Sequence, residues 1–148
     1  MGSNIEMNQK IQAIIKKAII VEKVYKDGTV NATNKSLIKY LNSKILHRNS
    51  LVKELRTHLL KSEEITIDQN ADAESLSSTK RITSEKDNQT LLEESIKIEK
   101  DILDHLEDIL DKEYITMDLR NILSNHYNSI KIEYESIKTL EDVEKAYS

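Results

Sequence analysis

Four long segments with helical apolar periodicity, arranged as two closely spaced pairs, constrain the fold of this chain more than any other feature. They are residues 8–27 and 34–62 in the first pair, and residues 89–111 and 117–139 in the second. The connection within each pair is short, so its two helices are expected to pack as antiparallel neighbours. A long polar stretch, residues 63–88, separates the pairs.

Each segment carries apolar side chains at alternating steps of three and four residues, which place them along one helical face. These predicted core positions are Ile11, Ile15, Ala18 and Tyr25; Leu37, Leu41, Ile45, Val52, Leu55 and Leu59; Leu92, Ile96, Leu103, Leu106 and Leu110; and Leu119, Leu123, Ile130, Ile137 and Leu140. The chain has no proline and only two glycines, so the residues that most often interrupt helices are nearly missing. Asp27-Gly28 predicts the end of the first helix, and Thr33 or Asn34 the N-cap of the second. Residues 141–148 predict a frayed tail or one extra turn.

Two antiparallel helical pairs joined by one long crossover are typical of the ferritin-like four-helix bundle. Stretches as long as residues 63–88 are uncommon inside compact domains unless they cross over or carry function. A chain of 148 residues is the size of one ordinary domain. We therefore predict an all-α, ferritin-like bundle that forms a single domain over residues 1–148.

Composition excludes several classes of function. The chain has no cysteine, which removes disulfides, thiolate metal sites and cysteine catalysis. The first residues lack the pattern of a secretory signal, and the longest apolar runs, such as Ala18 to Val21, are too short to span a membrane. No Ser–His–acid order and no phosphate-binding glycine loop is present. We expect a cytoplasmic protein without catalysis and identify no small-molecule substrate.

Three glutamates and one histidine fall at positions that the helical period assigns to the interior: Glu22, Glu99, Glu133 and His126. A buried carboxylate is costly unless it is paired, hydrogen-bonded or bound to a metal. If the crossover makes the second and third helices parallel, the three glutamates fall in the same half of the bundle. These four residues are therefore candidate ligands for iron, manganese or zinc.

The pattern of a di-iron site is incomplete in this chain. Such bundles use one glutamate from each of two helices and a Glu-x-x-His pair from each of the other two. The residue three before His47 is Lys44, and the residue three before His126 is Leu123. The favoured alternative is that the interior carboxylates are satisfied within the protein, and no cofactor is then expected. The partners considered for them are Tyr25, Tyr40, Tyr127, Tyr134 and Arg48.

Charge is distributed unevenly along the chain. Residues 1–62 hold 12 Lys and Arg against 4 Asp and Glu, while residues 63–148 hold 10 against 22. The first half thus carries a charge of +8 and the second −12. Opposite charges on the two hairpins favour pairing within the chain or across a homo-oligomer.

The basic character of residues 34–62 also suggests a nucleic-acid-associated protein as an alternative. Its cations are Lys35, Lys39, Lys44, Arg48, Lys53, Arg56 and Lys61. They are spread around the helix rather than gathered on one face, and the aromatic residues are not interleaved with them in a way that would stack bases. Electrostatic pairing of the two hairpins is the preferred interpretation.

The third helix contains the run Leu91-Leu92-Glu93-Glu94-Ser95-Ile96-Lys97-Ile98-Glu99. It resembles the hallmark of a bacterial ferritin-like, rubrerythrin-related family of unknown function, which typically has Leu-Leu-Glu-Glu-Cys-x-x-Gly-Glu there. The closing helix, from Tyr127 through Ile130-Lys131 to Leu140, is similar in spacing to that of the family. Tyr25, the run from Leu37 to Leu41, Arg48 and Glu54-Leu55 also fall in the family register.

The chain departs from the family pattern at several positions. Ser95 stands in place of the cysteine, Ile98 in place of the glycine, and Leu106 in place of an aromatic residue. Glu99 is the interior carboxylate that the pattern retains. The resemblance implies a four-helix bundle with no established enzymatic activity, often associated with stress responses. The leading hypothesis is therefore a structural or interaction protein, with a metal-binding or metal-oxidising bundle as the first alternative.

Overall fold

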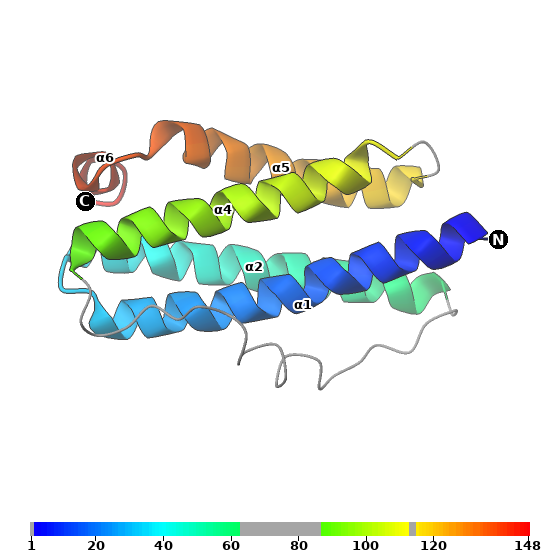
Figure 1. Ribbon diagram of the computed structural model, residues 1–148, viewed down its shortest axis with the longest axis horizontal. Helices are drawn as coiled ribbons and strands as arrows, with labels where there is room; N and C mark the ends of the chain where they lie inside the picture. The colour runs from blue at the N-terminus through cyan, green and yellow to red at the C-terminus, as the bar shows by residue number, and fades with distance from the viewer. Residues whose placement is uncertain (1, 63–86, 113–114) are drawn as a thin grey trace.

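The computed structural model describes residues 2–62, 87–112 and 115–148, and all regular structure in these ranges is helical. Four long helices lie side by side, α1 (Gly2–Asn31), α2 (Lys35–Ser62), α4 (Asn88–Leu110) and α5 (Met117–Ser136), followed by the short α6 (Leu140–Ala146) (Figure 1). The segment predicted as a crossover, residues 63–88, lies outside the described residues up to position 86. The prediction of an all-α chain is confirmed for the described part.

The helices pack as two hairpins. α1 lies against α2 and α4 against α5, while α1 also contacts α4 and α2 contacts α5. Partners within each hairpin run in opposite directions, whereas α2 and α4 run in the same direction (Figure 1). α2 therefore ends at the opposite end of the molecule from the beginning of α4. α6 lies at the end of the molecule where α4 begins, and it contacts α2 and α4 (Figure 1).

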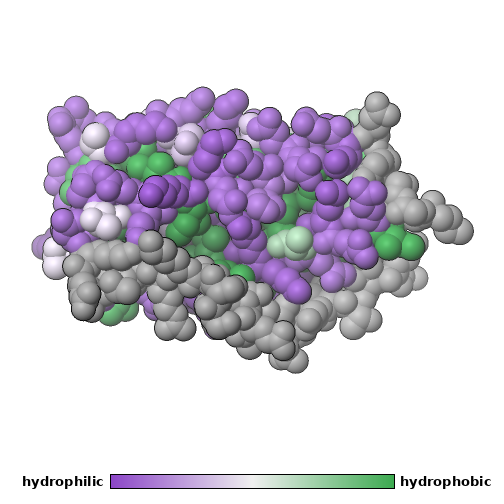
Figure 2. Space-filling model, viewed as in Figure 1, coloured by the Kyte–Doolittle hydropathy of each residue, from purple (hydrophilic) through white to green (hydrophobic). Residues whose placement is uncertain are grey.

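The core forms where the apolar positions of the four long helices meet. Most predicted core residues are buried, including Ile11, Leu41, Leu55, Leu106 and Leu123, each 0% exposed. Ile45, Ile96, Leu110 and Leu140 are only partly buried and pack against its margin. On the face in Figure 2, hydrophilic residues cover most of the surface, and hydrophobic residues show as a band across the middle.

The end predicted for the first helix is wrong. α1 begins at Gly2 and continues through Gly28 to Asn31, so it extends past the predicted residues 8–27 at both ends. Gly28 is buried, and its carbonyl accepts a hydrogen bond from the Ala32 amide at 2.8 Å. A glycine in a helix costs only about 1 kcal/mol relative to alanine, so packing of the surrounding turns can carry the helix past it.

Side chains cap the N-terminal ends of α2, α4 and α5. The Asn34 side chain accepts a hydrogen bond from the Leu37 amide at 3.0 Å, which confirms one of the two predicted N-caps. Asp87 caps α4 through the Thr90 amide, and Thr116 caps α5 through the Leu119 amide. Each cap satisfies an amide that the helix leaves without an internal partner.

The C-terminal part of the chain is more ordered than predicted. The fourth helix ends at Ser136 instead of residue 139, and Ile137 takes an extended conformation. Thr139 and Asp142 then form a reciprocal capping box that begins α6. Val143 on α6 is fully buried, so the tail docks onto the bundle and positions Tyr147 near its interior.

No helix within the described ranges combines the length and the apolar character needed to cross a membrane.

Candidate functional site

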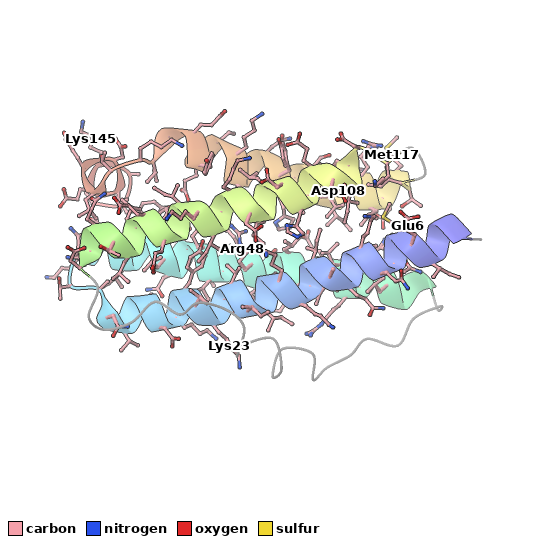
Figure 3. All side chains as sticks on the ribbon, viewed as in Figure 1. Glu6, Lys23, Arg48, Asp108, Met117 and Lys145 are labelled. Atoms are coloured by element: carbon pink, nitrogen blue, oxygen red, sulfur yellow. The ribbon has the colours of Figure 1, made fainter. Side chains whose placement is uncertain are left out.

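Four charged side chains meet in the interior, and we call them the ion-pair cluster: Lys44 and Arg48 from α2, Glu99 from α4 and Glu133 from α5. Lys44 is 1% exposed, Arg48 0% and Glu99 1%. Arg48 lies between the helices near the middle of the molecule, whereas Lys23 and Lys145 point outward (Figure 3). Such a group is rare in a core, because charged residues are almost never fully buried unless they are paired.

Glu99 is held on both carboxylate oxygens. Arg48 Nη2 donates to Glu99 Oε1 at 2.5 Å, and Lys44 Nζ lies 3.2 Å from the same oxygen. The Tyr25 hydroxyl donates to Glu99 Oε2 and lies 3.3 Å from the Ser95 carbonyl oxygen. Three helices, α1, α2 and α4, therefore converge on one carboxylate.

Glu133 completes the cluster from the other side. Its Oε1 atom forms an ion pair with the Lys44 ammonium, though not in hydrogen-bond geometry. Its Oε2 atom accepts a hydrogen bond from the Tyr147 hydroxyl at 2.5 Å. Tyr40 lines this side, with its ring centroid 5.2 Å from Lys44 Nζ and 5.6 Å from the Tyr147 ring in an edge-on arrangement. Two cations and two carboxylates make the cluster neutral.

The electrostatics of the cluster favour the charged forms of Glu99 and Arg48. Burial alone would raise the pKa of Glu99, but the charges of Arg48 and Lys44 and the hydrogen bonds to this carboxylate hold the pKa below its ordinary value. Burial would likewise lower the pKa of Arg48, yet the Glu99 charge raises it. Burial and the Glu99 charge together raise the pKa values of Tyr25 and Tyr40. For Tyr147, burial and the hydrogen bond to Glu133 raise the pKa to about 12.

The lowered pKa of Glu99 predicts that the folded protein loses stability in acid. Because the pKa of Glu99 is lower in the folded state than its unfolded value of about 4.3, its contribution to stability is present above that value and is lost as the pH falls through the folded pKa. We expect the free energy of unfolding to drop more steeply below about pH 5 in the wild-type protein than in Glu99→Gln. Urea unfolding of both proteins between pH 3 and 7, values chosen to bracket about 4.3, tests this. Parallel pH profiles would contradict it.

The helical period of α2 places Lys44 and Arg48 inside. Both continue the apolar face formed by Leu37, Leu41 and Leu55, at steps of three and four residues. Ser95 and Glu99 continue the corresponding face of α4, where the Ser95 hydroxyl donates to the Leu92 carbonyl at 2.7 Å. The sequence thus contained the signal for two interior cations, of which Arg48 was predicted as a partner of the interior carboxylates and Lys44 was not.

The four candidate metal ligands do not come together. Glu99 and Glu133 both contact Lys44, whereas Glu22 forms a 3.9 Å pair with Lys26 on its own helix. His126 pairs with Glu54 of α2. Among the described residues, no group of three or more His, Cys, Asp or Glu side chains could hold a metal ion.

The predicted protein partners of the interior carboxylates are correct in part. Tyr25 and Arg48 bind Glu99, while Tyr127 donates to Glu107 at 3.2 Å. Lys44 and Tyr147 were not predicted as partners. Tyr147 could not be found by helical period, because a change of chain direction after α5 brings it to Glu133.

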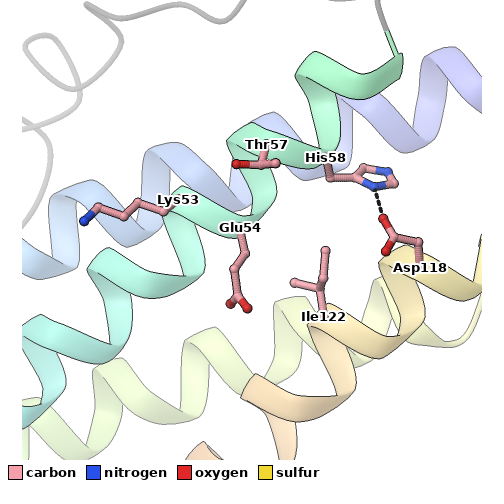
Figure 4. A pocket seen from close by; sticks show the side chains of 6 residues that line it. All are labelled: Lys53, Glu54, Thr57, His58, Asp118 and Ile122. Carbon is pink, nitrogen blue, oxygen red and sulfur yellow. Dashed lines mark hydrogen bonds and ion pairs between the residues drawn. The ribbon is translucent and has the colours of Figure 1, made fainter.

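A second acid–histidine pair, His58 and Asp118, also joins α2 to α5. Both residues line a hollow of about 280 Å³, together with Lys53, Glu54, Thr57 and Ile122 (Figure 4). His58 Nδ1 lies 3.0 Å from Asp118 Oδ2. The Asp118 side chain is 63% exposed, so this pair lies at the surface, where an ion pair contributes little to stability.

The two oppositely charged hairpins pair within the chain. Lys10 of α1 lies 3.1 Å from Asp108 of α4, and Lys17 forms an ion pair with Asp101. Two of the seven cations proposed for nucleic-acid binding, Lys44 and Arg48, are buried in the ion-pair cluster. The side chain of Lys61 lies outside the described residues.

Comparisons with protein-family models, with curated proteins and with solved structures gave no significant match for this chain.

Proposed function

We propose that the chain is a ferritin-like four-helix bundle without catalytic activity, acting as a structural or interaction protein. In this proposal the ion-pair cluster occupies the interior position that a metal centre takes in di-iron carboxylate bundles. The observation that carries it is that both oxygens of Glu99 are engaged by Arg48, Lys44 and Tyr25. Two cations beside the central carboxylate take the place of a metal's positive charge.

The arrangement of the helices supports the ferritin-like assignment. Two antiparallel hairpins pack so that α1 contacts α4 and α2 contacts α5, and α2 and α4 run in the same direction (Figure 1). A chain with this order needs one long connection between α2 and α4, and residues 63–87 are the segment between them. This matches a bundle with a single crossover.

The cluster also supports a structural role. Three helices, α2, α4 and α5, supply its four charged residues. Tyr25 from α1 and Tyr147, which directly follows α6, bind its two carboxylates. An apolar side chain can pack against many apolar neighbours, but a displaced buried charge loses its specific partner, which is costly. The cluster therefore acts to specify the relative register of the two hairpins, a use for which buried polar groups are best attested.

Self-association through complementary charge is the interaction that the surface supports. Lys35, Lys39 and Lys53 are exposed on α2, while Glu93 and Asp104 are exposed on α4. Copies arranged with these faces opposed would bring cations to carboxylates, and the attraction would weaken with salt.

Elemental analysis after incubation with iron, manganese or zinc tests the proposal. We expect far less than one metal ion per chain in the wild-type protein, with no difference in Glu99→Gln or in the exposed control Glu93→Gln. Near-stoichiometric metal that is lost only in Glu99→Gln would replace this proposal with a metal-binding bundle. Sedimentation of the same wild-type sample at low and high salt tests self-association, and a monomer at low salt would remove that part.

A further inference from the structure

The guanidinium of Arg48 has donors that the ion-pair cluster does not use. Arg48 is 0% exposed, and only its Nη2 atom donates to Glu99. The Nε and Nη1 atoms are buried without a hydrogen-bond partner in the protein. A buried donor on a charged group that lacks an acceptor costs several times the net value of an ordinary hydrogen bond, so an acceptor from outside the chain is called for.

A cavity of about 250 Å³ between α2 and α5 has Arg48 among the residues that line it. From α2 it is lined by Arg48, His47 and Ser50, and from α5 by Asn125 and Ser129. Each of these five side chains carries at least one N–H or O–H donor. Both walls of the cavity, from α2 and from α5, thus carry hydrogen-bond donors.

The remaining lining residues are Glu54, His126 and Ile130. The Glu54 carboxylate forms an ion pair with His126. Ile130 supplies an apolar wall. Burial and the nearby charges of Lys44 and Arg48 lower the pKa of His47, so its neutral ring can still donate one hydrogen bond. Arg48 supplies a buried positive charge to the lining.

We propose that this cavity binds a small oxyanion, a carboxylate or a phosphate, through Arg48 with support from Asn125 and Ser129. Arginine donates to such oxygens in a planar fork that suits both groups. The bound anion supplies the acceptor that Nε and Nη1 lack. This site is separate from the cluster apart from the shared guanidinium, and it adds a ligand to a bundle proposed to have no cofactor.

The test is titration of the ¹⁵N-labelled full chain with inorganic phosphate and, separately, with acetate, at constant ionic strength held by chloride. We expect a saturable shift of the Arg48 Nε–H signal and of the Ser50 and Ser129 amides with one of the two anions. The anion that saturates at the lower concentration defines the class of ligand. No saturable shift with either anion up to about 10 mM, ten times a dissociation constant of about 1 mM, would overturn the proposal and leave the cavity to water.

Surface variants separate the site from a general charge effect. Asn125 and Ser129 are both exposed, so Asn125→Ala and Ser129→Ala are expected to fold normally and to weaken binding about tenfold each, as loss of a hydrogen bond to a charged group does. Asn128→Ala, on the same helix but outside the cavity lining, is the matched control and should bind as the wild type does. Equal affinity in all three variants would overturn the assignment of the site.

Discussion

Replacing Glu99 with alanine is expected to lower the free energy of unfolding by about 3–5 kcal/mol, the range found when one partner of a buried ion pair is removed. The substitution leaves Lys44 and Arg48 in the interior with only Glu133 to balance them, and Arg48 loses its hydrogen bond at Nη2. It also leaves the buried Tyr25 hydroxyl without its carboxylate acceptor. Equilibrium urea unfolding followed by circular dichroism measures the change.

Glu93→Ala is the matched control, because Glu93 lies on the same helix but is exposed. Its effect is expected to stay within about 0.5 kcal/mol, as for most surface substitutions. If Glu99→Ala and Glu93→Ala cost the same, the ion-pair cluster does not form in the folded protein, and the structural proposal fails with it.

A double-mutant cycle on Arg48 and Glu99 should show strong coupling. Arg48→Met alone is expected to cost about 3–5 kcal/mol, because Glu99 and Glu133 would then share the single cation Lys44. With Arg48→Met and Glu99→Ala combined, one cation and one carboxylate remain, so charge balance returns. We expect the double variant to lose about 2 kcal/mol less free energy of unfolding than the two single variants lose together. This coupling is within the range for groups in one network.

Lys39→Met provides the control for this cycle. Lys39 is exposed on the same helix, so Lys39→Met combined with Glu99→Ala should be additive within about 0.5 kcal/mol. Additivity for Arg48 as well would mean that the two side chains do not interact, and the assigned partner of Glu99 would be wrong. Unfolding curves for all variants at one pH and one salt concentration allow the comparison.

Helical period accounted for most of the core and for part of the candidate site. It placed Glu99 and Glu133 in the interior, and the partners Tyr25 and Arg48 were among those considered for them. The same period also assigns Lys44 to the interior face of α2. A periodic position states which face of a helix a residue occupies, but a lysine on that face can equally reach outward to water at the margin of the core. Lys44 becomes an interior ion-pair partner because Glu99 on α4 and Glu133 on α5 lie at the same height along the bundle.

Helix ends predicted from short sequence patterns were wrong where tertiary packing contributes more free energy than the local preference. Gly28 was expected to end the first helix, yet α1 continues to Asn31 because one glycine costs little against several packed turns. Of the two alternatives expected for the C-terminal residues, fraying is wrong and added helix is confirmed, because α6 forms and docks through the fully buried Val143. In both cases the deciding contacts come from other helices, which no local pattern contains.

The sequence by itself determined the all-helical character of the described ranges, the positions of the long helices and most of the faces that they bury, since these follow from period and from the lack of proline. The tertiary structure alone decided which charges meet. Lys44 and Arg48 lie on α2, Glu99 on α4 and Glu133 on α5, and their pairing depends on the relative axial positions of three helices. Those positions are set by packing between distant segments. The pattern of one helix therefore does not show whether an interior glutamate binds a metal or pairs with a cation.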